Sequence, residues 1–254
     1  MKLATWNVNS IRAREALVLA WVRRHEPDVL CLQETKVVDD DFPAEPFQRL
    51  GYTVAAAGQR TYNGVAILSR RPLRDPVVGL VGARPTEDKR LLAATVDGVR
   101  VLCAYVPNGK STESPSFRDK LAWLGRLRET LDASCRPEAD VAVVGDFNVA
   151  FDERDVWDPE RFRGQLFFTD EERAALGRVL EFGLFDAYRH HHAERAFTWW
   201  DYRGAGFERD LGMRIDHVLL SASALARCRS ATIDVEARRG ERPSDHAPVV
   251  VELE

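Results

Sequence analysis

Short apolar runs, set between turn-forming residues, recur along the chain and constrain its fold more than any other feature. The segment 28–34 contains the apolar run VLCL before a polar end, and 141–144 is wholly apolar; both runs are too short for a buried helix, which predicts strands covered on both faces. In 91–105 the apolar pattern is interrupted at residues 97 and 98 by Asp-Gly, a two-residue turn signal that predicts a hairpin. Further strands are predicted at 2–8, 51–57, 64–69, 215–220, 231–235 and 247–253.

Three longer segments have the spacing of helices. Apolar residues form a stripe at helical spacing in 10–25, a second helix is predicted near 117–134, and Thr169 to Glu172 form a capping box that opens a third helix ending near residue 182. Strands and helices alternate unevenly, with hairpins among the helical connections. This pattern favours an α/β fold with sheets packed face to face and helices outside, rather than a doubly wound parallel sheet.

The organisation of the chain predicts one domain spanning residues 1–254, because no internal repeat, linker or shift in composition marks a boundary. The four cysteines form no CxxC pair and are expected to be reduced packing residues. No secretory signal or membrane-spanning stretch is evident, so we expect a cytoplasmic protein that does not bind membranes. The chain carries 36 Lys and Arg against 40 Asp and Glu, a net charge of −4, so any polyanion must meet a local basic patch.

Polar residues stand where the predicted strands end or begin. Asn7, Glu34, Tyr105, Asp146 and Asn148 follow early strands, whereas Asp216, Asp245 and His246 precede late ones. If the late strands run antiparallel to the early ones, all these side chains converge on one rim of the sheets. Each alone has a simpler explanation, such as a solvated strand end or a turn aspartate, but together they predict a site.

Carboxylates crowded on one rim repel each other unless a cation neutralises them or one takes a proton. Magnesium is commonly held by one or two carboxylates together with substrate phosphate, a need that Glu34 meets alone or with one aspartate. Neither an HExxH motif nor a Cys/His quartet is present, so zinc has no evident site. A metal, a carboxylate and a histidine together are the equipment for hydrolysing a phosphate ester.

Seven motifs, in this order along the chain, resemble the exonuclease III family of apurinic/apyrimidinic (AP) endonucleases, within the endonuclease/exonuclease/phosphatase superfamily. They are TWNVNSIR (5–12), LQETK (32–36), YVPNG (105–109), GDFN (145–148), TWWDYR (198–203), RID (214–216) and SDHAP (244–248). The resemblance implies a four-layered α/β sandwich of two mixed, mostly antiparallel sheets. It also implies cleavage of duplex DNA 5′ to abasic sites, dependent on Mg²⁺ or Mn²⁺, with 3′→5′ exonuclease, 3′-phosphatase and 3′-phosphodiesterase activity.

By matching position, the resemblance makes Glu34 the principal metal ligand with Asn7 beside it, and places Asp245 near the metal. Asp146 orients or deprotonates the attacking water, Asn148 holds that water or a phosphate oxygen, and Tyr105 reaches the phosphate. His246 contacts the scissile phosphate with its tautomer fixed by Asp216. The wider set of metal contacts is Asn7, Glu34, Asp146, Asn148, Asp245 and His246. Whether Asp146 or the Asp216 and His246 pair is the general base is left open, since both have suitable chemistry.

The expected partner is double-stranded DNA with abasic sites or blocked 3′ ends, bound by a monomer. The predicted DNA contacts are Arg12, Lys36, Arg90, Asn108, Trp199, Trp200, Tyr202 and Arg203. The aromatic members are expected to line a pocket for a base-free sugar, with at least one tryptophan packed in the core. Met213 and the segment 152–169 depart from the family pattern and bear on the balance of activities. The rival hypotheses are a hydrolase of another phosphoester and a DNA-binding module without catalysis.

Overall fold

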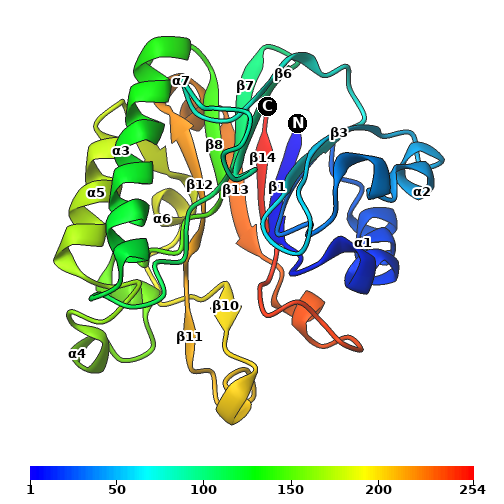
Figure 1. Ribbon diagram of the computed structural model, residues 1–254. Coiled ribbons are helices and arrows are strands. Elements are labelled where there is room, and N and C mark those ends of the chain that lie inside the picture. The colour runs from blue at the N-terminus through cyan, green and yellow to red at the C-terminus, as the bar shows by residue number, and fades with distance from the viewer.

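Two six-stranded sheets pack face to face, and helices cover the outer face of each, in the computed structural model, which describes residues 1–254 (Figure 1). Helices α1 and α2 lie on one flank, and α3 and α5 lie on the other (Figure 1). The helices are α1 (Ile11–His25), α2 (Ala44–Gln48), α3 (Pro115–Ser134), α4 (Pro159–Phe162), α5 (Asp170–Leu180), α6 (Ala187–His191) and α7 (Ala222–Ala226). The layered α/β architecture expected from the sequence is confirmed.

The first sheet has the strand order β13-β14-β1-β2-β4-β3. Its pairs are antiparallel except β1 with β2, which run parallel and are joined through α1. The strands are β1 (Lys2–Asn7), β2 (Val29–Gln33), β3 (Thr53–Ala57), β4 (Val65–Ser69), β13 (Cys228–Ile233) and β14 (Val249–Leu253).

The second sheet has the order β5-β6-β7-β8-β12-β9 and repeats this plan. Its one parallel pair, β7 with β8, is joined through α3, and the others are antiparallel. The strands are β5 (Arg74–Val78), β6 (Leu91–Val96), β7 (Val99–Tyr105), β8 (Val141–Asp146), β9 (Leu184–Asp186) and β12 (Asp216–Ser221). A separate hairpin of β10 (Trp199–Trp200) and β11 (Gly212–Met213) extends beyond the sheets (Figure 1).

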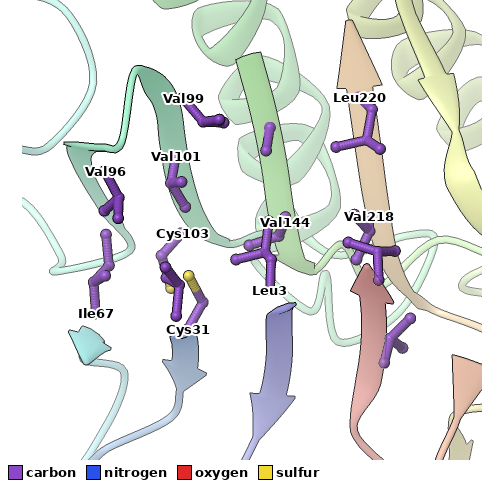
Figure 2. Packing of buried hydrophobic residues seen from close by; sticks show 14 of the residues in the cluster. Leu3, Cys31, Ile67, Val96, Val99, Val101, Cys103, Val144, Val218 and Leu220 are labelled. Atoms are coloured by element: carbon purple, nitrogen blue, oxygen red, sulfur yellow. The ribbon is translucent and has the colours of Figure 1, made fainter. Parts of the chain in front are cut away.

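The largest apolar cluster lies between the sheets. Leu3 and Cys31 from the first sheet meet Cys103, Val144 and other residues of the second (Figure 2). Two further clusters lie under the helices: one joins the second sheet to α3 and α5, and one joins the first sheet to α1. Strands that are apolar on both faces therefore pack against the other sheet on one face and against helices on the other, as the continuous apolar runs predicted.

Helix beginnings follow the capping signals. Ser114 accepts from the amide of Phe117 at the start of α3, and Thr169 and Glu172 form the predicted capping box of α5. The cysteines Cys31, Cys103, Cys135 and Cys228 are all free. None of the helices combines the length and the apolar composition that crossing a membrane requires.

The predicted elements lie within a few residues of the observed ones, but several short elements were not predicted. These are α2, α4, α6, α7, β5, β9, β10 and β11. The strand predicted at 231–235 begins earlier, at Cys228, and ends at Ile233, because it pairs with β14 through an irregularity near Ser230.

Candidate active site

The polar strand ends converge on one rim because of the strand directions. The parallel pairs β1–β2 and β7–β8 end at this rim. Strands β12 and β14 run antiparallel to β8 and β1, so they begin there. In this register Asp146 lies beside Tyr105 on one neighbouring strand and beside Asp216 on the other.

Asn7 links the two sheets at the rim. Its Nδ2 donates to Glu34 Oε1 at 2.8 Å and to Asp146 Oδ2 at 2.9 Å. The backbone of Glu34 has a φ of 53°, in the left-handed region, which a non-glycine residue adopts at a cost. One amide thus holds two carboxylates that come from different sheets.

His246 is held from one side by Asp216. Its Nδ1 lies 2.8 Å from Asp216 Oδ2, and its Nε2 lies 3.9 Å from Asp146 Oδ2. Ser244 Oγ accepts from the His246 amide and donates to the Asn7 carbonyl, so the loop before β14 is tied to the end of β1. The contact between Asp216 and His246 Nδ1, which the resemblance implied would fix the tautomer, is therefore present in the structure.

Burial and charge shift the pKa values of this group. Burial raises the pKa of Asp146 to about 7, against the opposing effect of His246, and the Asp216 and Glu34 charges add to the rise. Burial alone would lower the pKa of His246, but the carboxylates of Asp216 and Asp146 raise it to about 10. Burial would raise the pKa of Glu34, but Lys36 and Asn7 lower it below its ordinary value.

A metal ion fits the residues at this rim. Ligand atoms of Glu34, Asp146 and His246 lie within 4.8 Å of one another. Two of the three donors are carboxylates, the ligands of hard cations, and the pKa of Asp146 is raised by burial and, to a smaller extent, by the Asp216 and Glu34 charges, which a cation would offset. The amine of Lys36 lies 2.8 Å from Glu34 Oε2, so the cluster already attracts one cation.

The other predicted metal contacts, Asp245 and Asn148, hydrogen-bond to neighbouring residues at the rim. Asp245 accepts from Asn9 Nδ2 and Trp199 Nε1, each at 3.0 Å, which uses one bond on each carboxylate oxygen. Asn148 donates from Nδ2 to the Val106 carbonyl at 3.0 Å, and its Oδ1 accepts from Asn108. Tyr105 is buried beside this group, and burial and the Glu34 charge raise its pKa well above the ordinary value.

The predicted DNA contacts have different surroundings. Arg12 pairs with Asp41 at 3.0 Å, Arg90 lies over the Tyr105 ring at 4.7 Å, and Asn108 contacts Asn148 at 3.3 Å. The side chain of Arg203 is 91% exposed and pairs with Asp201. Tyr202 is half exposed and donates to the Pro243 carbonyl.

One of these predictions disagrees with the structure. Trp200 is only 2% exposed and packs with Phe197 and Ala247, so its ring has no surface to offer DNA. Trp199 is partly exposed and lies beside the site through its bond to Asp245. The core tryptophan expected in this motif is therefore Trp200.

Several buried charges near the site escaped prediction. Lys120 of α3 pairs with Glu172, and Arg214 pairs with Asp155 and Asp186, the contact to Asp155 Oδ1 measuring 2.7 Å. In the sequence, a lysine on an amphipathic helix or an arginine beside a strand is most simply a surface residue. The only sequence signals that involved these residues were the capping box that contains Glu172 and the RID motif that contains Arg214.

Comparisons with known proteins agree with this geometry. The model of the Endonuclease/Exonuclease/phosphatase family matches residues 4–246. Exodeoxyribonuclease III of Haemophilus influenzae is 33% identical over 266 residues, covering all of both chains. Two solved structures match the whole chain and 99% of their own, each with a TM-score of 0.96: the 3′ phosphatase NExo from Neisseria, bound to a product DNA hairpin (40% identity), and an AP endonuclease from Archaeoglobus fulgidus (37%). The chain belongs to the endonuclease/exonuclease/phosphatase family.

Proposed function

We propose that this protein is a magnesium-dependent DNA-repair nuclease that cleaves the phosphodiester 5′ to abasic sites in duplex DNA. Its companion activities are 3′→5′ exonuclease, 3′-phosphatase and 3′-phosphodiesterase, as in base excision repair. The observation that carries the proposal is the convergence of Glu34, Asp146 and His246, with ligand atoms within 4.8 Å, on a rim that six strands form. The similarity to a nuclease, a 3′ phosphatase and an AP endonuclease supports it.

Glu34 is the proposed principal metal ligand, and Asp146 presents a carboxylate oxygen to the same space. Magnesium, or manganese in its place, would supply positive charge that offsets the charge of the phosphoryl oxygens. Asn7 keeps the two carboxylates in place through its two donated bonds. Asn148 and Tyr105 are proposed to contact the phosphate, since each ends a strand or loop at this rim.

Asp146 is the proposed general base. Its pKa of about 7 allows it to accept a proton from water near neutral pH, and its Oδ1 is fixed by the amide of Asn148 at 2.9 Å. His246, with a pKa of about 10 and Nδ1 on Asp216, is protonated at neutral pH. It therefore serves as a cationic donor to a phosphate oxygen rather than as the base.

A cleft beside the site supports binding of DNA. Its volume is about 710 Å³, and its walls include Trp199, Phe167, Met213 and the cations Arg161 and Arg203. Aromatic rings can receive a sugar that has left the base stack, while arginines neutralise phosphates. The cleft meets the rim at Trp199, whose Nε1 donates to Asp245.

The test uses three duplexes: one with an internal abasic analogue, one with a nick that ends in a 3′ phosphate, and an intact duplex with a recessed 3′ end. Each is incubated with the full chain and either magnesium or a chelator. We expect a magnesium-dependent nick 5′ to the abasic analogue, release of phosphate from the second duplex, and slow trimming of the third. Failure to act on any duplex, with hydrolysis of a phosphoester other than DNA, would overturn the proposal.

A second candidate is an enzyme that processes 3′ ends without incising at abasic sites. Phe167 favours it, because its ring packs edge-on against Trp199 at 5.9 Å and reduces the space for an extruded sugar. Its φ of 74° shows that a bulky residue is held in a backbone region that suits glycine. The similarity to a 3′ phosphatase at 40% identity is in line with this alternative.

A further inference from the structure

Lys120 is a buried ammonium with three acceptors. It lies on α3 with a side chain that is 0% exposed, and it pairs with the equally buried Glu172 at the start of α5. Its Nζ also donates to the Asn148 carbonyl at 2.6 Å and to the Asn108 carbonyl at 3.3 Å. A buried charge needs hydrogen-bond partners that replace the water it has lost. Two of the three acceptors of Lys120 belong to loops at the active-site rim.

Those two loops also contact each other directly. Asn108 follows β7 and Asn148 follows β8; their side chains form a bond of 3.3 Å from Nδ2 to Oδ1, and Asn148 Nδ2 donates to the Val106 carbonyl at 3.0 Å. Asn148 has a φ of 51°, so its backbone is held in the left-handed region. The bond from Lys120 to the Asn148 carbonyl acts directly on this constrained peptide.

Glu172 extends the contact to the wall of the cleft. Its Oε1, which pairs with Lys120, also accepts from the Phe167 amide at 3.1 Å. Its Oε2 accepts from the amide and hydroxyl of Thr169, which completes the capping box. Lys120 Nζ lies 5.0 Å from the centre of the Phe167 ring. One buried pair thus touches the Asn108 loop, the Asn148 loop and the segment that carries Phe167.

We infer that Lys120 is a positioning residue for phosphoester hydrolysis, because it fixes the Asn108 and Asn148 loops so that the Asn148 side chain faces the reacting phosphate. The inference rests on the proposed function for the role of Asn148. A purely stabilising role explains the geometry less well, since buried ion pairs often contribute little net stability and need no contact with site loops.

The experiment compares four forms of the full chain: the parent, Lys120→Met, Lys120→Met with Glu172→Gln, and Leu131→Ala as a control. Methionine keeps the length of the side chain without its charge. Glutamine at position 172 removes the unpaired carboxylate but still serves in a capping box. Leu131 is buried on the same helix, away from the two loops, so its truncation leaves a cavity in the cluster between α3, α5 and the second sheet without removing a contact to either loop.

The readouts are the thermal midpoint, and kcat and KM on a nicked duplex with a 3′ phosphate and on the p-nitrophenyl ester of thymidine monophosphate. Rates are taken per folded molecule at a temperature where circular dichroism shows all four forms folded. We expect kcat to fall about 100-fold in Lys120→Met, the scale of a catalytic group displaced by about 1 Å. KM should change less than about threefold, and Leu131→Ala should keep its kcat.

The double variant separates positioning from stability. We expect Glu172→Gln to restore much of the thermal midpoint lost in Lys120→Met without restoring kcat. Recovery of kcat together with the midpoint would overturn the inference, as would parental kcat in Lys120→Met. If Lys120→Met does not fold, the double variant alone decides. Hydrolysis of the small ester but not of DNA by the parent would reject the proposed function and leave the Lys120 comparison intact on the ester, whereas inactivity on both would reject both.

Discussion

At the scale of single residues, Glu34 is held by one cation and one neutral amide. Its Oε2 lies 2.8 Å from the amine of Lys36, and its Oε1 accepts from Asn7. A metal ion at this carboxylate must compete with Lys36. We expect Glu34→Gln to raise the magnesium concentration for half-maximal rate at least about tenfold, as loss of a charged ligand would. We expect Lys36→Met to lower it. Magnesium titrations of the initial rate measure both, and equal magnesium requirements in all three proteins would contradict the assignment of Glu34.

Asp146 and His246 define an expected dependence of rate on pH. A base must be deprotonated, so the rate falls as pH drops through the pKa of Asp146, which burial raises to about 7 and which a bound cation would lower from there. A cationic donor must stay protonated, so the rate also falls as pH rises through the pKa of His246, about 10. The profile is therefore a bell.

Asp216→Asn tests which group controls the alkaline side of the bell. Asp216 is the charge that most raises the pKa of His246, and it also raises that of Asp146. We expect the alkaline limb to move toward neutral pH and the acid limb to move slightly lower, in kcat/KM measured from pH 5 to 10.5. His190→Ala, at an exposed histidine, is the control. An alkaline limb that stays in place would show that His246 does not set it.

The sequence revealed the residues of the rim but not what holds them. Asn7, Glu34, Asp146, Asp216 and His246 could be found because polar residues at the ends of apolar strands are conspicuous. The partners of Asp245 and Asn148 at the same rim could not, because Asn9 and Lys120 lie in ordinary loop and helix contexts. Hydrogen bonds between residues more than 25 positions apart depend on the packing of whole elements, which a local pattern does not contain.

At the scale of elements, Gly145 allows β8 to lie against β7. Its φ is 147°, and a Cβ at this position would lie 1.8 Å from the Ala104 carbonyl oxygen. We expect Gly145→Ala to destabilise the protein by roughly 2–4 kcal/mol, because both a backbone clash and an unfavourable conformation oppose it. Gly125 in α3 is the matched control, since a Cβ there meets nothing within 4 Å. Gly125→Ala should stabilise by up to about 1 kcal/mol. Urea unfolding measures both, and equal midpoints would refute the role of Gly145.

Elements were predictable where they bury a regular face. Strands β2 and β8 are buried at every residue, and α3 carries a clear apolar stripe. Strand β5 was missed because all five of its residues are exposed and it contains Pro76 on the sheet edge. Strand β9 has only three residues. Such edge strands form because the adjacent strand of the sheet has unpaired backbone N–H and C=O groups, and not because their own side chains favour a strand.

At the scale of the whole molecule, two equivalent halves build one site. Each sheet has a single parallel pair, β1–β2 or β7–β8, connected through one long helix. The carboxyl ends of both pairs meet at the rim, so each half supplies a carboxylate: Glu34 comes from one sheet and Asp146 from the other. No sequence repeat revealed this arrangement, because packing of a shared core constrains residue size and polarity rather than identity.

Phe167, in the wall of the cleft beside the site, bears on the choice between abasic sites and 3′ phosphates. Phe167 packs against Trp199, and its left-handed φ suits glycine, so Phe167→Gly should open the cleft without straining the backbone. We expect this variant to raise incision at an abasic analogue by up to about tenfold relative to release of a 3′ phosphate, the scale of one aromatic contact. Phe185→Gly, at an exposed phenylalanine outside this cleft, is the control. An unchanged ratio of the two rates would remove Phe167 from the account of selectivity.

The net charge of −4 means that DNA must be bound through a few well-placed cations. Arg203 is the most exposed of those predicted, and its only ion pair is with Asp201. Affinity for duplex DNA depends on released counterions, so loss of one phosphate contact should reduce the slope of log KM against log salt by about 1. We therefore expect Arg203→Gln to raise KM several-fold at low salt with an unchanged kcat. Arg229→Gln removes an exposed charge at the opposite end of the first sheet, beside Glu254, and should leave the slope unchanged. If log KM depends on log salt equally in both variants, Arg203 makes no phosphate contact and the DNA does not lie over the β10–β11 hairpin.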